Sequence, residues 1–252
     1  MPIERYFLDN CFKINGQHEL KGSEFHHLAH VMRTRKGDTV ELVNGKGALA
    51  EATVKDVLKE KALLKIENIV QEPTRPYRLI LAQAMPKSNR LDFILEKGTE
   101  LGVDAFWLFP GDCSAKKEIF PNQHERARAL TIAAMKQCGR LTLPDIILQP
   151  ALDQWPSLVK MTVFFGDLEP EALPFEVAWK QLSSPSYPIV FITGPEAGLS
   201  KQEGQLLRSK GATGVKLHSN ILRTDTASLM ALGLLSHWFL TSPATKLLLD
   251  NS

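Results

Sequence analysis

The chain has 252 residues, 44% of them hydrophobic, so it can build one large or two small domains without disulfides or structural metals. Its 30 basic and 28 acidic side chains nearly cancel, so the overall charge does not identify it as a nucleic-acid-binding protein. The three cysteines, Cys11, Cys113 and Cys138, are widely spaced and form no CxxC pair, which indicates neither a zinc ribbon nor a disulfide framework.

Residues 1–72 are predicted to be mainly β-structure. Apolar and polar residues alternate in the segments 39–44, 48–57 and 62–70, as expected for strands with one buried face. Glycine-containing turns flank the first of these segments. The pattern predicts a small β-barrel.

One short helix is predicted inside this β-rich part, from Ser23, a good N-cap residue, to Arg33. Its apolar residues Phe25, Leu28 and Val31–Met32 are expected to be buried against the strands.

Residues 73–76, with the sequence Pro-Thr-Arg-Pro, are predicted to form a stiff linker, because both prolines disfavour helix and lack a backbone donor. We place the domain boundary there, between a first domain of residues 1–72 and a second of residues 73–252. The second domain alternates between strands and helices. The predicted strands are 79–84, 105–109, 145–148, 162–165, 189–193 and 214–217, and the predicted helices are 90–101, 123–138 and 227–240.

These strands are apolar and poor in charge, as buried parallel strands are when helices cover both faces of a sheet. The sequence therefore predicts an α/β domain. The last helix, 227–240, is apolar nearly all round, so we expect it to be deeply buried or covered by a partner subunit.

A glycine-containing loop, Gly194–Ser200, follows one buried strand directly. Gly194 and Gly198 allow the close approach of a flat ligand, and Pro195 stiffens the turn. Ser200-Lys201-Gln202-Glu203 is a predicted capping box that starts a helix. Ligands of parallel sheets bind outside the carboxyl ends of the strands, so this loop is a candidate site; an ordinary strand–helix turn is the alternative.

A second loop, residues 218–223, follows the strand 214–217 in the same way. Thr224 or Asp225 is predicted to cap the final helix, and Arg223 stands at the edge of the loop. The alternative is that the apolar residues of this loop belong to the core and that Arg223 is a surface charge. Two such loops on consecutive strands favour a shared cleft.

Missing motifs narrow the kind of ligand. The chain contains no GxGxxG, no Walker motif and no GxSxG, so an ordinary dinucleotide site, nucleotide hydrolysis and a serine hydrolase are not indicated. His26 and His30 lie four residues apart on one helix face, but no cysteine or carboxylate triad accompanies them, so no metal is expected.

The N-terminal residues lack the basic-then-apolar plan of a signal peptide. No apolar run approaches the roughly 18 residues needed to span a bilayer. We therefore expect a cytoplasmic protein without a membrane partner.

The two loops, read as GPEAGLSxxE and LHSNILRTDTA, resemble the C-terminal motifs of the RsmE family. This family comprises bacterial methyltransferases of the SPOUT superfamily that act on the N3 of a 16S rRNA uridine. Further motifs in the same order extend the resemblance over most of the chain. They are Arg5–Leu8, His26–Leu28, Val31–Arg33, Gly37–Asp38, Lys97–Val103 and Gln137–Arg140.

The resemblance implies a PUA-like RNA-binding β-barrel domain followed by a SPOUT α/β domain whose C-terminus threads a trefoil knot. Knots are rare exceptions to the rule that chains do not thread loops, and periodicity alone would not have suggested one. The resemblance also implies a homodimer, S-adenosylmethionine bound in the knot, and 16S rRNA of the small ribosomal subunit as substrate.

On this resemblance the cofactor is held by both loops, largely through backbone amides and carbonyls. The residues concerned are Thr193, Gly194, Pro195, Glu196, Gly198, Leu217, His218, Ile221, Leu222, Arg223 and Ala227. Methylating a uridine N3 requires the removal of an imide proton before attack on the methyl group. The predicted catalytic residues are Arg223, which would stabilise the developing anion or bind phosphate, and the carboxylates Glu196 and Asp225. Glu196 is favoured as the base.

Basic residues in both domains are predicted to contact RNA. They are Arg5, Arg33, Arg35, Lys87, Arg90 and Arg140. For Arg140 the alternative is a charge at a helix C-terminus that complements the helix dipole.

The chain departs from the family pattern at four positions. Ala197 and His218 stand where the family usually has glycine, Asp225 where it usually has glutamate, and Cys113 where relatives tend to carry an arginine. Alanine is tolerable where φ is negative, and His218 keeps its backbone amide. The departures leave the backbone donors for a cofactor in place.

Two other functions stay open. One is a non-catalytic RNA-binding or ribosome-assembly protein that keeps the fold, which would be favoured if Ala197 and His218 closed the cofactor pocket. The other is a SPOUT enzyme that modifies a different group, such as a ribose hydroxyl; the PUA-like first domain argues against it.

Overall fold

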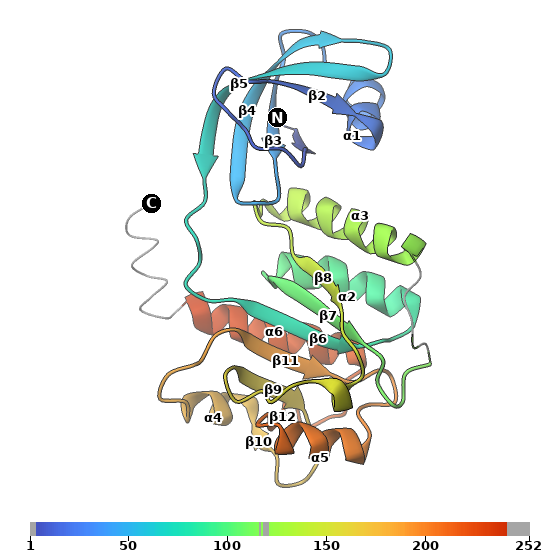
Figure 1. Ribbon diagram of the computed structural model, residues 1–252, viewed down its shortest axis with the longest axis vertical. Coiled ribbons are helices and arrows are strands. Elements are labelled where there is room, and N and C mark those ends of the chain that lie inside the picture. Colours follow the sequence, from blue (N-terminus) through green and yellow to red (C-terminus); the bar gives the residue numbers. More distant parts are fainter. Residues whose placement is uncertain (1–3, 116, 118–120, 241–252) are drawn as a thin grey trace. The chain divides into compact units, whose positions relative to one another are not determined.

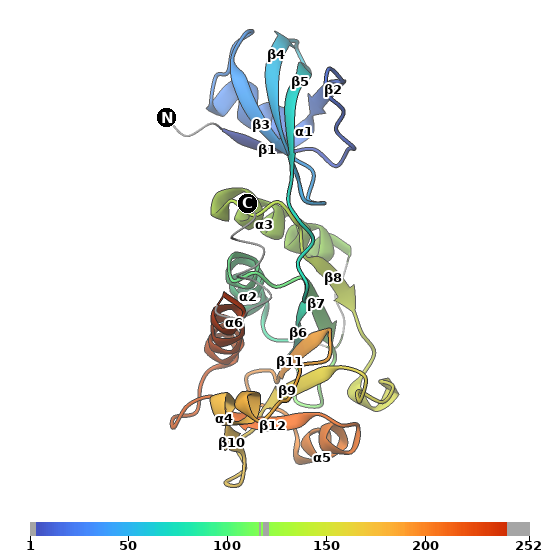
Figure 2. The same cartoon turned by 90° about the vertical axis from the view of Figure 1, so that its left-hand side faces the viewer.

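The computed structural model describes residues 4–115, 117 and 121–240. The chain divides into two compact units, drawn in Figures 1 and 2. The first combines the residues up to Thr74 with Met135–Leu143, and the second combines Arg75–Ala134 with the residues from Pro144 on. The segment Met135–Leu143 was not predicted to group with the N-terminal part.

The first unit is built on a five-stranded curled sheet with the order β1-β3-β4-β5-β2 (Figure 1). Its strands are β1 (Arg5–Phe7), β2 (Gln17–Lys21), β3 (Thr39–Val43), β4 (Ala48–Val57) and β5 (Lys61–Gln71). Only β1 and β3 are parallel; the other pairs are antiparallel. Alternate residues of β3, β4 and β5 are buried, among them Leu42, Val54 and Leu64, so the predicted alternation is confirmed.

The helix predicted in this unit is shorter and less regular than expected. α1 (Gly22–His26) continues into a π-helical turn, η1 (His27–Val31). Phe25 and Leu28 are buried as predicted, whereas Val31 and Met32 are 56% and 39% exposed, so that part of the prediction is wrong. The amide of Met32 donates to the carbonyl of His27, an i→i+5 bond that widens the turn and rotates the following side chains away from the sheet.

Arg33 ends this helix in the left-handed region, with φ 55°. The amide of Thr34 then returns to the carbonyl of Leu28 at 3.0 Å, as in the closing turn of many helices. The predicted helix end at Arg33 is therefore close to the observed one, but its left-handed conformation was not predicted, because glycine is the usual residue at such a position.

The second unit is built on a seven-stranded sheet with the order β10-β12-β9-β11-β6-β7-β8. Its strands are β6 (Leu79–Ala84), β7 (Ala105–Phe109), β8 (Asp145–Leu148), β9 (Thr162–Gly166), β10 (Leu173–Pro174), β11 (Ile189–Thr193) and β12 (Thr213–Lys216). Every pair in the sheet is parallel, which confirms the predicted α/β class. The two-residue strand β10 was not predicted, because so short a segment has no periodicity to detect.

Helices cover both faces of this sheet, and the residues of β6 alternate between two cores. Leu79 and Leu81 pack with α2 (Ser88–Glu100), α4 (Phe175–Lys180) and α6 (Thr224–Leu240). Ile80 and Ala82 pack on the other side with α5 (Lys201–Ser209) and the 3-10 turn η2 (Leu152–Gln154). Burial on both faces explains why the strands read as continuous apolar runs.

The last helix, α6, packs against α2, β6 and β11. Gly98 of α2 permits close packing on this face, since a Cβ there would lie 2.8 Å from the ring of Phe106. Ala231, Leu232 and Leu235 of α6 are fully buried, whereas Leu240 is 59% exposed. The predicted burial of α6 is therefore confirmed for one side of the helix; a partner subunit and the knot stay predictions.

The remaining long helix, α3 (Pro121–Cys138), begins in the second unit, and its residues from Met135 on belong to the first. In the part of the chain that the structure describes, no helix is long and apolar enough to cross a membrane.

Candidate functional site

The candidate site lies at the edge of the seven-stranded sheet where its parallel strands end. β11 lies between β6 and β9, and its last residue, Thr193, pairs with Gln83 of β6. The loops that follow β6 and β11 therefore leave the sheet side by side. This is the edge at which parallel α/β sheets bind their ligands.

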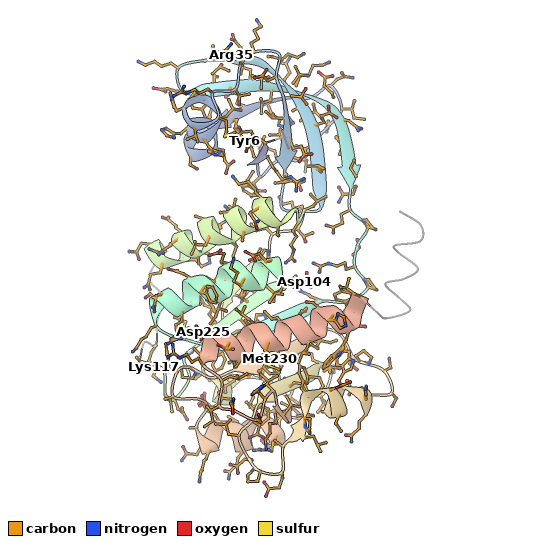
Figure 3. The ribbon with its side chains drawn as sticks, turned by 180° about the vertical axis from the view of Figure 1, so that it is seen from behind. Tyr6, Arg35, Asp104, Lys117, Asp225 and Met230 are labelled. Carbon is orange, nitrogen blue, oxygen red and sulfur yellow. The ribbon has the colours of Figure 1, made fainter. Side chains whose placement is uncertain are left out.

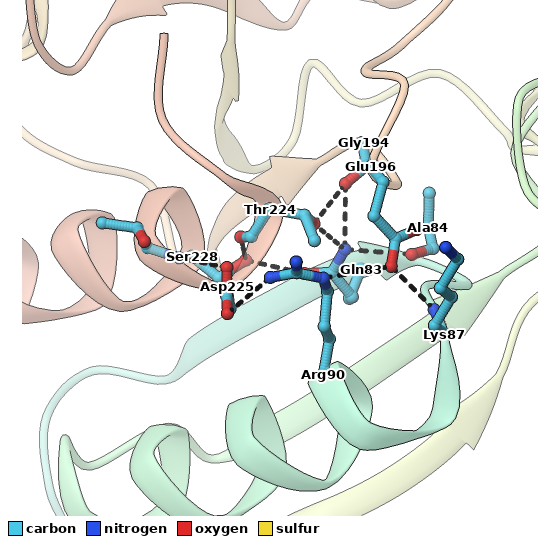
Figure 4. A network of polar contacts seen from close by, with 10 residues as sticks. Gln83, Ala84, Lys87, Arg90, Gly194, Glu196, Thr224, Asp225 and Ser228 are labelled. Carbon is cyan, nitrogen blue, oxygen red and sulfur yellow. Dashed lines mark hydrogen bonds and ion pairs between the residues drawn. The ribbon is translucent and has the colours of Figure 1, made fainter. Parts of the chain in front are cut away.

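A buried carboxamide joins these loops to the final helix (Figure 4). Gln83 is fully buried, and its Nε2 donates to the carbonyls of Ala84 and Gly194, at 2.9 and 3.1 Å, and to the Oγ1 of Thr224, at 3.0 Å. Its Oε1 accepts from the hydroxyl of Ser228 at 2.6 Å. The start of the loop Gly194–Ser200 and the first turn of α6 are thus held around one side chain.

Thr224 adds a second bond to the same loop, since its hydroxyl donates to the carbonyl of Gly194 at 2.6 Å. The prediction that Thr224 or Asp225 caps α6 is wrong. α6 begins at Thr224, and the amide of Ala227 donates to the carbonyl of Arg223, so Arg223 occupies the cap position. The hydroxyl that was expected to cap the helix is used to hold the loop instead.

Glycine is favoured at two positions of the first loop, Gly194 and Gly198, for different structural reasons. A Cβ on Gly194 would lie 2.5 Å from the amide nitrogen of Leu199 and 2.6 Å from the carbonyl carbon of Gly198, so the turn closes only on glycine. Gly198 has φ 77°, a conformation that favours glycine, and a Cβ built on it would meet no atom within 4 Å. Open space therefore adjoins the loop at Gly198.

The predicted capping box at the end of the loop is confirmed. The amide of Glu203 donates to Ser200 Oγ at 3.0 Å, and the amide of Ser200 donates to Glu203 Oε2 at 2.7 Å. The other carboxylate oxygen of the buried Glu203 accepts from the amide of Asp112 at 3.0 Å, and Ser200 Oγ lies 2.6 Å from Asp112 Oδ2. The loop after β7 is therefore tied to the same helix start, a contact that the sequence did not indicate.

Arg90 brings together the two predicted catalytic carboxylates (Figure 4). Its Nη1 donates to Asp225 Oδ2 at 2.8 Å, and its Nε lies 3.4 Å from Glu196 Oε1. Glu196 Oε1 also accepts from the backbone amide of Lys87 at 3.0 Å. The sequence predicts an RNA contact for Arg90, because nothing along the chain connects it to residues more than 100 positions away.

The second loop is open to solvent. Ile221 is 80% exposed, and the side chains of His218 and Arg223 are also exposed. The ring nitrogen Nδ1 of His218 accepts from the amide of Asn220 at 3.0 Å. Arg223 forms no ion pair with the residues that the structure describes, so its guanidinium is accessible to a ligand.

The departures from the family glycines cause no backbone strain. Among the described residues other than glycine, only Asn15 and Arg33 have positive φ, so Ala197 and His218 do not. Both side chains are exposed. The backbone does not require glycine at either position.

Three observations bear on whether these loops suit a flat cofactor with polar edges. The hydroxyl of Thr193 is buried at the base of the first loop without a hydrogen-bond partner in the described chain. Gly198 faces open space, and Ile221 presents an apolar side chain to solvent. An unpaired polar atom, room at a glycine and an exposed apolar side chain suit such a ligand.

The residues predicted to contact RNA differ in availability. Arg5 is held by Glu41, with its Nε and Nη2 at 2.9 and 2.7 Å from one carboxylate oxygen. Arg140 donates from its Nε to the hydroxyl of Thr142 at 3.0 Å. The side chains of Arg33, Arg35 and Lys87 are exposed, and Figure 3 labels Arg35.

A cavity of about 460 Å³ lies in the second unit, lined in part by Lys201, which directly follows the first loop. It is charged rather than apolar, and its lining includes Asp167, Glu169, Glu171, Lys201, Gln205 and Arg208. It contains none of the predicted cofactor residues. Among the described residues, no group of three or more histidines, cysteines or carboxylates is arranged to hold a metal.

Comparison with known proteins agrees with this architecture. The family described as an RNA methyltransferase domain matches residues 73–236, and that described as an RNA methyltransferase PUA domain matches residues 20–67. Ribosomal RNA small subunit methyltransferase E of Bacillus subtilis is 29% identical, over 93% of this chain and 96% of the relative. The enzyme of the same name from Mycobacterium bovis is 31% identical, over 86% of each chain.

A solved structure extends the similarity. Ribosomal RNA small subunit methyltransferase E of Neisseria gonorrhoeae, bound to S-adenosyl methionine, superimposes with a TM-score of 0.82 at 28% identity and covers 94% of this chain and 98% of its own. A PUA domain followed in the sequence by an RNA methyltransferase domain on a parallel sheet defines the class of RNA methyltransferases with a PUA domain. Within that class, the chain belongs to the ribosomal RNA small subunit methyltransferase E family, as its motifs predicted.

Proposed function

We propose that this protein transfers the methyl group of S-adenosylmethionine to the N3 of a uridine in 16S rRNA of the small ribosomal subunit. Methylation of ribosomal RNA with S-adenosylmethionine follows from the family. The observation that carries the proposal is the junction at Gln83, which holds the GPEAG loop against the LRTDTA segment. Both motifs of the resemblance thus meet at one edge of the sheet.

The cofactor would be held by the two loops, through the residues predicted from the sequence: Thr193, Gly194, Pro195, Glu196, Gly198, Leu217, His218, Ile221, Leu222, Arg223 and Ala227. When bound, S-adenosylmethionine supplies a methyl group on a positively charged sulfur. The unpaired hydroxyl of Thr193 and the exposed side chain of Ile221 support this assignment, because they offer one polar and one apolar contact.

Proton removal from N3 is assigned to Glu196. One of its oxygens, Oε1, is anchored by the amide of Lys87 and by Arg90, whereas Oε2 has no partner among the described residues. In Asp225 both oxygens are engaged, Oδ2 by Arg90 and Oδ1 by the amide of Thr226 at 3.1 Å. Glu196 therefore has the oxygen that could accept a proton, and Asp225 serves to hold Arg90.

The negative charge that develops on the uridine needs a donor nearby. The exposed guanidinium of Arg223 stands at the edge of the second loop and is assigned this role. The proton of N3 passes to Glu196, and N3 then forms a bond to the methyl carbon. The carbon–sulfur bond of the cofactor breaks, and the sulfur keeps its electron pair.

RNA would be contacted from both units. Arg33, Arg35 and Lys87 are available for phosphates, since their side chains are exposed. Arg5, Arg90 and Arg140 have partners within the chain, so they would have to exchange them in order to bind RNA.

We further propose that the protein acts in the cytoplasm as a homodimer, and that residues 1–72 and 73–252 are its functional domains.

A non-catalytic assembly protein is the rival that the sequence left open. Closure of the pocket by Ala197 and His218 would favour it, but both side chains are exposed on an unstrained backbone, which supports the enzyme instead. Calorimetry with S-adenosylmethionine separates the two, because the rival would show no binding at millimolar cofactor.

Mass spectrometry of 16S rRNA tests the reaction itself. We expect a strain without the gene to lack one N3-methyluridine and the cloned gene to restore it. An unchanged methyluridine inventory, or the loss of a ribose methylation instead, would contradict the proposal.

A further inference from the structure

Arg90 connects three segments that are far apart in the sequence. It lies in the first turn of α2 and contacts Glu196, in the loop after β11, and Asp225, in the first turn of α6. Glu196 is fastened to the same helix start by the amide of Lys87. The guanidinium therefore joins the loop that carries the proposed base to the helix start next to Arg223.

The charge balance shows what holds these segments together. Two carboxylates face one guanidinium, and the side chains of Arg90, Glu196 and Asp225 are 23%, 28% and 19% exposed. Without Arg90, two like charges would face each other with no cation between them, and repulsion would separate the loop from α6. The planar, forked guanidinium suits two partners in a way that an ammonium does not.

Stability does not account for this cluster. The buried contacts of Gln83 already bind Gly194 to Thr224 beneath it. A partly exposed ion pair adds little to the free energy of folding. Its effect is instead on the geometry of two side chains, Glu196 and Arg223, whose separation matters for the reaction.

We propose that Arg90 is a positioning residue for methyl transfer, which sets the distance between Glu196 and Arg223 by holding both loops. This inference rests on the proposed function for the identity of the base. It differs from the role expected from the sequence, in which Arg90 contacts RNA.

The test compares Arg90→Met and Arg90→Lys with a matched control. Arg126→Met removes another arginine of the same unit, one that pairs with Asp92 of α2 at 2.6 Å and, among the described residues, forms no ion pair with either loop. The measurements are kcat and KM for methyl transfer to 16S rRNA or small subunits, and the Kd for S-adenosylmethionine from calorimetry.

For Arg90→Met we expect kcat to fall about 10–100-fold, since a displacement of 1 Å can cost a factor of that order. The Kd for the cofactor should rise by a smaller factor than kcat falls, because Arg90 contacts the loops that hold the cofactor but is not itself among the proposed cofactor contacts. The kcat of Arg90→Lys should lie between those of Arg90→Met and the wild type. Guanidinium ion added to the Arg90→Met protein should also restore part of its kcat. Arg126→Met should stay within about twofold of the wild type, as is usual for exposed pairs.

Equal activities of the Arg90→Met and Arg126→Met proteins would overturn the inference. So would an unchanged kcat with a raised KM for RNA, which would return Arg90 to the role of an RNA contact. A raised Kd for S-adenosylmethionine that accounts for the whole loss would make it a cofactor contact.

Hydrogen exchange gives a readout that does not depend on activity. In Arg90→Met, exchange should increase at residues 194–200 and in the first turn of α6, and in Arg126→Met it should not. If wild-type protein fails to methylate RNA, the proposed function is wrong, and the exchange data still decide whether Arg90 holds the loops. If the wild type is active and exchange at both segments is unchanged, only the Arg90 inference is wrong.

Discussion

Gln83 is the residue on which the candidate site depends most directly. Its carboxamide has two N–H groups and reaches the carbonyls of Ala84 and Gly194 and the hydroxyl of Thr224, so at least one of these bonds is shared. Its partners Gly194 and Ser228 lie 111 and 145 positions further along the chain. A single glutamine inside an apolar strand predicted none of these contacts.

Replacing Gln83 should destabilise the protein even though leucine has a similar size. In Gln83→Leu the buried acceptors lose their donor, at a cost of about 1–3 kcal/mol in the free energy of unfolding. Gln83→Glu should cost more, because its carboxylate would have no N–H to offer the two carbonyls. Urea unfolding measures both; a wild-type midpoint for Gln83→Leu would show that the network adds no stability.

Arg223 allows the sharpest test of catalysis by one side chain. Because the guanidinium is exposed and α6 uses only the carbonyl of Arg223, Arg223→Ala should leave the fold and cofactor binding intact. We expect methyl incorporation to fall by about 100-fold or more, the effect of removing a donor from a developing anion. Lys180→Ala, an exposed change on α4, is the control, and full activity of Arg223→Ala would mean that the active site lies elsewhere.

At the scale of helices and strands, elements with local signals were predictable. The capping box at Ser200 and Glu203 lies within four residues, and every strand longer than three residues in the second unit had an apolar run. The π-turn at His27–Val31 had no comparable signal, because an extra residue in one turn leaves composition unchanged. The start of α6 was missed because the hydroxyl of Thr224 bonds to a distant loop.

The capping box predicts a measurable loss of stability. Ser200→Ala removes the acceptor for the amide of Glu203 and the hydroxyl contact with Asp112, so unfolding should be easier by about 1 kcal/mol. Ser209→Ala, near the other end of α5, should have a smaller effect. Thermal unfolding followed by circular dichroism checks this, and equal Tm values for the two variants would contradict it.

The left-handed conformation of Arg33 at the end of the helix predicts that a substitution there can stabilise the protein. A residue other than glycine in the left-handed region costs roughly 1–2 kcal/mol, and the greater freedom of glycine when unfolded costs about 0.5–1 kcal/mol. Arg33→Gly should therefore raise the free energy of unfolding slightly, whereas Arg35→Gly should lower it. If Arg33→Gly also weakens RNA binding in a filter assay, that loss reflects the missing cation; a destabilised Arg33→Gly would refute the strain argument.

At the scale of the whole molecule, the α/β class and the family followed from the sequence. Parallel strands were indicated by apolar runs between helices, and the family by several motifs in order. The grouping of Met135–Leu143 with the N-terminal residues could not be predicted. It depends on contacts such as Lys136 with Glu24 at 2.7 Å and the amide of Gly47 with the carbonyl of Leu141 at 3.0 Å, which join segments about 100 positions apart.

The homodimer is a prediction at this scale. α6 is apolar on most sides, and Leu240 remains 59% exposed, so we expect a second copy to cover part of this helix. Sedimentation equilibrium at micromolar concentration should give twice the mass of the chain. A monomer at that concentration, with full methyl transfer, would rule out a dimer as the active form.

The division of the chain into two units also limits which fragments of this protein can be expressed or exchanged separately. The amides of Gly47 and Leu143 donate to the carbonyls of Leu141 and Gly45, so the short segment after α3 is bonded to the turn before β4. A gene fragment cut at the linker would lack this segment. The PUA-like unit is therefore not a continuous stretch of sequence, and recombination could exchange it between proteins only together with the end of α3. A fusion protein that contains this unit should include both segments.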